Sequence, residues 1–325
     1  MRIKIFCVAL SALLLALSVS SEAQQPAKIT KIGWLVTSSD GPVGGRELLQ
    51  RELRELGYVE GKNIAFEYRY GENKLERLPA LADELVRLKV DVLVANTTPA
   101  TLAAKNATRT IPIVFIGVGD PVASGLVDSL ARPGGNITGL TNISAVLAGK
   151  RLELLKETVP KLSRVAVLWN PQAPGAPQWK ESQLAAQGLG LQLHSMEVSS
   201  ADKYQSAFKE AIKAGSAGLA VTQQTLATSN RKQIPDLATK NRLPAIYPRG
   251  DFVESGGLMS YGPDRAEPYK RVASMIDKIL RGAKPASIPV EQPMKFELVI
   301  NLKAAKQIGL TIPPAVIYQA DRVVK

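Results

Sequence analysis

The chain has 325 residues, with 41 lysines and arginines against 29 aspartates and glutamates, and a formal net charge of +12. Acidic residues are interleaved with the basic ones, as in Arg46-Glu47 and Arg51-Glu52, which is typical of solvated helix faces and argues against a nucleic-acid partner. The single cysteine, Cys7, lies in the N-terminal apolar run, so disulfides, cysteine metal sites and cysteine nucleophiles are excluded from the chain after that run.

The N-terminus has the composition of a secretory signal peptide. Arg2 and Lys4 precede an apolar run over residues 5–19, and small residues follow up to Ala23. That run is too short for a comfortable membrane span. We therefore predict that residues 1–23 are a signal peptide cleaved near Ala23, and that the mature protein is a soluble exported protein.

In the first half of the chain, apolar runs alternate with amphipathic segments. The pattern predicts strands over 29–36, 65–70, 92–95, 113–116 and 137–140, and helices over 45–56, 75–88, 98–107 and 123–131. The runs 92–95 and 113–116 flank an alanine-rich helix. They should therefore be parallel neighbours joined by a right-handed crossover.

Polar side chains follow these strands where the strands end. Ser38 and Ser39 follow the first, Thr97 and Thr98 the third, and Asp120 the fourth. Open α/β sheets bind ligands at the carboxyl ends of their strands, so these residues are candidate ligand contacts. Thr98-Pro99 reads as a helix N-cap followed by proline, and free N–H groups there would favour a carboxylate or another anion. The alternative is that Thr98 only caps its helix.

The second half repeats the same alternation. The pattern predicts strands over 164–169, 191–198, 218–222, 243–247 and 296–302, and helices over 149–158, 178–188, 203–214, 229–241, 265–280 and 303–308. Residues 258–262 should cross back between the halves. We expect an α/β fold of two Rossmann-like lobes with parallel sheets and an interlobe cleft. The first lobe would hold residues 24–142 plus 262–283, and the second residues 143–261 plus 284–325.

No catalytic constellation survives inspection. The single histidine, His194, lies in a predicted strand, and the chain has no HExxH motif, Walker-type glycine loop or G-x-S-x-G elbow. We therefore expect no enzyme activity, cofactor or metal. What remains is a set of polar and aromatic residues at strand ends that could enclose a small molecule: Ser38, Ser39, Thr97, Thr98, Asp120, Asn170, Gln224, Tyr247, Ser260 and Tyr261. For each tyrosine alone, core packing is the alternative.

Long blocks of the chain resemble a known family. They are ELGYVEGKNIAFEYRYGENKLERLPALADELV, IPIVFIGVGDPVASGLVDSLARPGGNITGLT, LPAIYPRGDFVESGGLMSYGPD and PVEQPMKFELVINLKAAKQIGLTIPP. These blocks are similar to the ABC-transporter substrate-binding proteins that include TrpX-like proteins. The resemblance implies a type I-like periplasmic binding protein that holds a small ligand in its cleft and delivers it to an ABC permease in the inner membrane.

The resemblance leaves the ligand and the partner open. In the family the loop after the strand matching 218–222 often reads Asp-Pro-Leu, whereas this chain has Gln224-Thr225-Leu226. A neutral Gln224 supplies no charge for a ligand ammonium. The ligand is therefore not a simple amino acid, or Asp120 holds its amine. We expect a monomer. The rival functions are a ligand-sensing module for a signalling receptor, which closes in the same way, and a hydrolase, for which the chain offers no nucleophile–base pair.

Overall fold

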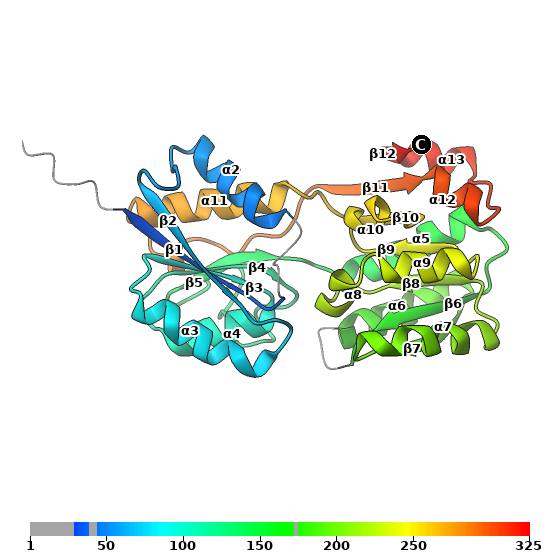
Figure 1. The fold of residues 1–325 in the computed structure, drawn as a ribbon, viewed down its shortest axis with the longest axis horizontal. Coiled ribbons are helices and arrows are strands. Elements are labelled where there is room, and N and C mark those ends of the chain that lie inside the picture. Colours follow the sequence, from blue (N-terminus) through cyan, green and yellow to red (C-terminus); the bar gives the residue numbers. More distant parts are fainter. Residues whose placement is uncertain (1–28, 39–43, 172–174) are drawn as a thin grey trace, which may run out of the picture.

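The computed structural model describes residues 29–38, 44–171 and 175–325 and shows two α/β lobes side by side along the long axis (Figure 1). The predicted signal peptide and Ser39 lie outside these residues. Each lobe is built on one sheet with helices on both faces, so the prediction of a two-lobed α/β fold is confirmed.

The first lobe contains a five-stranded, fully parallel sheet in the order β2-β1-β3-β4-β5. Its strands are β1 (Thr30–Val36), β2 (Ile64–Tyr70), β3 (Val92–Asn96), β4 (Ile113–Val118) and β5 (Ile137–Thr141). Its helices are α2 (Gly45–Glu55), η1 (Leu75–Arg77), α3 (Leu78–Arg87), α4 (Thr98–Ala107), α11 (Glu267–Leu280) and η3 (Pro285–Ser287). Alternate residues of the strands pack against α2 and α11 on one face and against α3 and α4 on the other.

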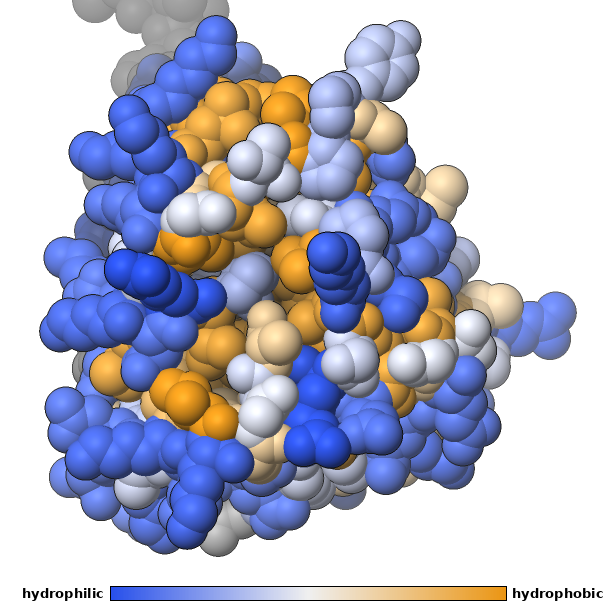
Figure 2. All heavy atoms as spheres, turned by 90° about the vertical axis from the view of Figure 1, so that its right-hand side faces the viewer, coloured by the Kyte–Doolittle hydropathy of each residue, from blue (hydrophilic) through white to orange (hydrophobic). Residues whose placement is uncertain are grey.

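The second lobe contains a seven-stranded sheet in the order β12-β11-β10-β9-β8-β6-β7. Its strands are β6 (Arg164–Trp169), β7 (Gln192–Glu197), β8 (Gly218–Val221), β9 (Ala245–Tyr247), β10 (Met259–Pro263), β11 (Phe296–Asn301) and β12 (Arg322–Val324). Its helices are α5 (Val146–Thr158), α6 (Gly175–Leu189), η2 (Ala201–Lys203), α7 (Tyr204–Lys213), α8 (Thr225–Ser229), α9 (Gln233–Lys240), α10 (Gly250–Glu254), α12 (Leu302–Gln307) and α13 (Pro314–Gln319). Among the pairings that the structure describes in this sheet, that of β10 with β11 is antiparallel and the others are parallel. Figure 2 faces the end of this lobe that lies away from the first, where apolar side chains gather between polar ones.

Three predicted elements were wrong. Residues 121–125 form turns instead of starting a helix, because Asp120 caps a tight turn and Gly125 adopts a left-handed φ of 65°. The predicted helix over 229–241 begins too early, since its helical part is α9 from Gln233 to Lys240 and Ser229 is the last residue of the separate short helix α8. Residues 258–262 do not cross between lobes: they contain most of β10, which pairs with β9 and β11 inside the second sheet.

Within the described chain, three segments pass between the lobes: 142–145, 264–266 and 292–295. The second and third are paired, since the Asp264 N–H donates to the Lys295 carbonyl at 2.9 Å. Just before the third, Ile288 and Val290 pack in the cores of the first lobe, and Glu291 bonds to Gly139 of β5. We expected residues 284–325 to belong to the second lobe. These contacts favour assigning residues 284–291 to the first lobe, and we propose that boundary instead.

Candidate functional site

The carboxyl ends of the strands in the two sheets are directed toward each other. Only residues 142–145 separate the end of β5 from α5 of the second lobe, and only 264–266 separate the end of β10 from α11 of the first. Such short connections require each carboxyl edge to face the other lobe. Figure 1 agrees, since α8 and α10, which follow β8 and β9, lie on the side of the second lobe nearer the first. Ligands bind at this edge in open α/β sheets.

In the first lobe, the ends of β1 and β3 are joined by two threonines. The hydroxyl oxygens of Thr37 and Thr97 lie 2.7 Å apart, and Ser38 beside them is 8% exposed. Thr97, not Thr98, occupies the N-cap position of α4, so the predicted N-cap was one residue too far along the chain. Thr98 is the first residue of the helix. The prediction also omitted Thr37, although it stands in the same polar turn as Ser38.

Thr97 has a strained backbone. Its φ of 80° and ψ of 161° fall in a region that is essentially confined to glycine. Three hydrogen bonds hold it there: its N–H donates to the Ile116 carbonyl at 3.0 Å, and its own carbonyl accepts from the N–H and the hydroxyl of Thr101 at 3.1 and 2.7 Å. Such a residue costs about 1–3 kcal/mol and is found most often at binding and catalytic sites. The strain therefore marks this strand end as a candidate site.

Asp120 lies on an exposed turn after β4. One of its carboxylate oxygens accepts from the N–H groups of Val122 and Ala123 at 3.1 and 2.9 Å. The neighbouring Asn142 ties the end of β4 to the first interlobe segment, because its amide donates to the Gly117 carbonyl at 2.9 Å and accepts from Ser144. Asp120 thus has a structural role as a cap, and its second oxygen is the one that could meet a ligand.

In the second lobe, side-chain amides line the ends of β6 and β8. Asn170 is 8% exposed, and Gln224 is 3% exposed. Gln178 of α6 is fully buried and makes a two-point contact with the backbone of Gln223, donating to its carbonyl at 2.9 Å and accepting from its N–H at 2.7 Å. Gln178 is not among the residues predicted from the sequence. The feature of the sequence that could have identified Gln178 is a polar residue on the buried face of the helix that follows Asn170.

The candidates on β9 and β10 do not converge on one point. Tyr247 is 1% exposed and stacks on Phe252 with ring centroids 5.0 Å apart, and burial raises its pKa. Ser260 is its neighbour on β10 and is also 1% exposed. Tyr261 points to the opposite face of the sheet, where it stacks on Phe296 at 6.1 Å. Tyr247 therefore belongs to one core of the lobe, and Tyr261 is half-buried against the other; core packing was the alternative for each.

A charged cluster lies where the second lobe meets α11. Arg249 donates to both carboxylate oxygens of Asp251, from Nε at 3.3 and 3.2 Å and from a terminal nitrogen at 2.9 Å. Burial lowers the pKa of Arg249, but the Asp251 carboxylate, together with Tyr269 and Glu254, outweighs that effect and the net pKa is raised. Burial raises the pKa of Tyr269 in α11 to about 12, against the opposing charges of Arg249 and Arg265. The charge of Arg249 in the second lobe thus acts on the Tyr269 side chain in the first lobe.

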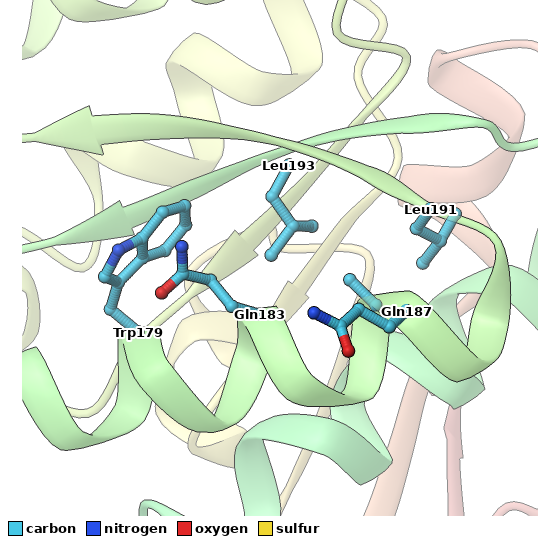
Figure 3. A pocket seen from close by; sticks show the side chains of 6 residues that line it. Trp179, Gln183, Gln187, Leu191 and Leu193 are labelled. Carbon is cyan, nitrogen blue, oxygen red and sulfur yellow. The ribbon is translucent and has the colours of Figure 1, made fainter.

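Two surface hollows lie elsewhere in the second lobe. One, of about 240 Å³, lies between α6 and the edge strand β7 and is lined by Trp179, Gln183, Ala186, Gln187, Leu191 and Leu193 (Figure 3). The other, of about 310 Å³, is formed by residues 229–233. None of the predicted site residues lines either hollow. In the described part of the chain, no group of acidic, cysteine or histidine side chains is arranged to hold a metal, and no helix is long and apolar enough to cross a bilayer.

Comparison with known proteins points to one family. A family model described as "ABC transporter substrate binding protein" matches residues 36–324. A relative from Clostridioides difficile (strain R20291), called "Tyrosine-binding protein", is 28% identical over 261 residues, covering 80% of this chain and 75% of the relative.

Two solved structures have closely similar folds. A conserved domain protein from Vibrio cholerae O1 biovar eltor is 31% identical with a TM-score of 0.85, covering 91% of this chain and all of that one. An ABC domain in complex with L-Trp from Streptococcus pneumonia is 26% identical with a TM-score of 0.83 and the same coverage.

Proposed function

Since the chain belongs to the ABC transporter substrate binding protein family, we propose that it is the periplasmic solute-binding component of an ABC importer. It closes on a small organic ligand held between its lobes and presents that ligand to a permease in the inner membrane. The observation that carries this proposal is the opposition of the two carboxyl edges, each of which has polar residues directly after its strands.

The first lobe supplies hydroxyl and N–H groups to the ligand. The strained Thr97 directs the chain into α4, whose first N–H groups and positive dipole end favour a carboxylate or another anion. Thr98 at the first helical position and the Thr37–Thr97 hydroxyl pair add polar contacts. A relative that binds tyrosine by name and a structure holding L-Trp make an amino-acid-like or carboxylate ligand the first class to test.

The second lobe supplies neutral amides and closes over the ligand. Asn170 and Gln224 lie at the ends of β6 and β8, and Gln178 fixes the backbone beside Gln224. A ligand that contacts both lobes favours the closed arrangement over the open one, and the permease recognises the closed shape. We leave Tyr247 and Tyr261 out of the proposed ligand set, because Tyr247 is buried in the core and Tyr261 stacks on Phe296.

The three interlobe segments act as the hinge. Ile143 lies in the first of them with a φ of 41°, which is unusual for a β-branched residue. Hinges are a few loop positions that absorb large backbone changes during closure. This backbone conformation costs free energy in the state that requires it, and the cost is removed when the segment rearranges. Ile143 therefore shifts the equilibrium between the open and closed forms.

A ligand screen tests the proposal. The purified exported chain is screened by thermal shift against amino acids, carboxylates, sugars and nucleobases, and each hit is measured by calorimetry. We expect a ligand with a Kd of about 1 µM or tighter, which corresponds to about 8 kcal/mol of binding free energy. Hydrolysis of p-nitrophenyl esters or phosphates by the same preparation, seen as release of p-nitrophenol, together with no binding hit, would instead support the hydrolase rival.

A further inference from the structure

Gln224 buries a side-chain amide at the inner end of the second lobe. It directly follows Thr222 and Gln223 at the end of β8, takes the N-cap position of α8 and is 3% exposed. Among the residues that the structure describes, neither its Oε1 nor its Nε2 has a hydrogen-bond partner. Removing an amide from water without replacing its hydrogen bonds is costly. A conformation that keeps such a group needs a partner from outside the chain.

Hydrogen bonds on both sides of Gln224 fix the backbone that carries this amide. The two-point contact from Gln178 fixes Gln223 on one side. On the other side the Gln224 carbonyl accepts from the N–H and the hydroxyl of Thr228 at 3.1 and 3.0 Å. The backbone of Gln224 is therefore held at both ends while its side chain is left unpaired. Gln178, the neighbouring buried amide, has its donor and its acceptor both used.

We infer that Gln224 recognises a group of the ligand that carries a hydrogen-bond donor and an acceptor side by side, as in a carboxamide or the lactam edge of a nucleobase. This inference rests on the proposed function. An amide pairs with such a group at two points, because its oxygen accepts and its nitrogen donates in one plane, as when glutamine reads adenine. A carboxylate offers acceptors only and an ammonium donors only, so either leaves one atom of Gln224 unpaired.

The position of Gln224 suits this role. α8 lies on the side of the second lobe that faces the first (Figure 1), and the carboxyl end of β8 is the edge at which the ligand is proposed to bind. The glutamine side chain has three rotatable bonds, so its amide can turn toward an arriving ligand while the backbone contacts with Gln178 and Thr228 stay in place. The first lobe would hold the anionic end of the same ligand.

The test compares matched probes on matched variants. Nicotinamide is paired with nicotinate, glutamine with glutamate, and hypoxanthine is added, with L-tryptophan and L-tyrosine as references. Gln224→Met keeps the length of the side chain but removes both hydrogen-bonding atoms. Gln183→Met makes the same change at an exposed side chain of α6, in the hollow between α6 and β7 (Figure 3). Calorimetry gives the affinity, and thermal unfolding gives the stability of the unliganded protein.

We expect an amide or lactam probe to bind at least about tenfold more tightly than its carboxylate counterpart, and Gln224→Met to lose at least that factor. Unliganded Gln224→Met should melt about 2–4 °C higher than wild type, because the unpaired amide is gone. Gln183→Met should leave the affinity unchanged. Should Gln224→Met fail to fold, Gln224→Glu takes its place, since it keeps the shape and should weaken the amide probe by a similar factor.

The outcomes separate this inference from the function it rests on. If L-tryptophan or L-tyrosine binds and Gln224→Met leaves that affinity unchanged, the binding function stands and the inference is overturned. A crystal structure in which an ordered water pairs with Gln224 both with and without ligand would also overturn it. If no compound in a broad metabolite screen binds, the proposed function fails and the inference fails with it.

Discussion

At the scale of single residues, the strained backbone of Thr97 lies beside the polar side chains at the ends of β1 and β3. Thr97 adopts a backbone conformation suited to glycine, and its hydroxyl lies 2.7 Å from that of Thr37. Three hydrogen bonds to its backbone hold the residue in place, so the strain is supported by the ends of β3 and β4 and by the first turn of α4. This arrangement orients the first N–H groups of α4 before any ligand arrives, which reduces the ordering cost of binding.

Thr98→Val tests whether that strand end contacts the ligand. Thr98 is partly buried at the start of α4, and loss of one hydroxyl contact should weaken binding by about 1–2 kcal/mol, measured by calorimetry. Thr101→Val is the control: it removes the hydroxyl that bonds the Thr97 carbonyl and should lower stability by about 1 kcal/mol with a smaller effect on affinity. If wild type and Thr98→Val bind the ligand with equal affinity, Thr98 has only a structural role at the start of α4.

Tyr269→Phe tests the electrostatics near the hinge. Burial raises the pKa of Tyr269 from 10.0 to about 12, so between these values the folded protein keeps a proton that the unfolded chain releases. The stability linked to Tyr269 is therefore complete below pH 10 and is lost as pH rises toward 12, by up to about 2–3 kcal/mol. Urea midpoints from pH 9 to 12 should fall less steeply in Tyr269→Phe. Tyr318→Phe, at a side chain that is 93% exposed, should follow wild type.

The candidate site could be predicted from sequence only in part. Polar residues after apolar runs located Ser38, Thr97, Asn170 and Gln224 at strand ends, because parallel strands bring those ends to one edge. The sequence could not separate Tyr247 from a ligand contact, since a tyrosine after an apolar run is found in cores and in sites alike. Gln178 was missed because its contact with Gln223 joins residues 45 positions apart.

At the scale of elements, close contacts between strands and loops fix the second sheet near the hinge. Gly262 lies in β10 against residue 248, and an added Cβ would overlap the carbonyl oxygen of Pro248. Gly262→Ala should therefore destabilise the protein by about 1–3 kcal/mol in denaturant unfolding. Gly188→Ala is the matched control, because an added Cβ in α6 meets nothing within 4 Å and should stabilise the helix by about 0.5–1 kcal/mol. An unchanged stability in Gly262→Ala would show that β9 and β10 can separate freely.

Long periodic segments were predicted well, and turn-rich segments were not. The alternation of apolar runs and amphipathic helices predicted the strands of both sheets except β10 and β12, because burial in a parallel sheet leaves a continuous apolar run. Residues 123–131 failed because Asp120, Pro121 and Gly125 favour successive turns over a helix. β10 was mistaken for a crossing segment because its pairing with β11 is made by residues about 40 positions later in the chain.

At the scale of the whole molecule, two lobes are connected by segments that come from distant parts of the sequence. Asn142 orders the first segment, and the Asp264–Lys295 backbone pair joins the other two. A chain that crosses several times between its lobes allows rotation of one lobe on the other while limiting their separation. This architecture, with polar strand ends on both inner edges, is the basis for our proposal of closure on a ligand.

Small-angle X-ray scattering of the exported chain, with and without a saturating ligand found in the screen, tests this claim most directly. Our account predicts that the ligand lowers the radius of gyration and that the change follows the calorimetric binding curve, because contacts to both lobes draw them together. A ligand that binds tightly but leaves the scattering curve unchanged would show that it does not close the lobes, and would contradict the account.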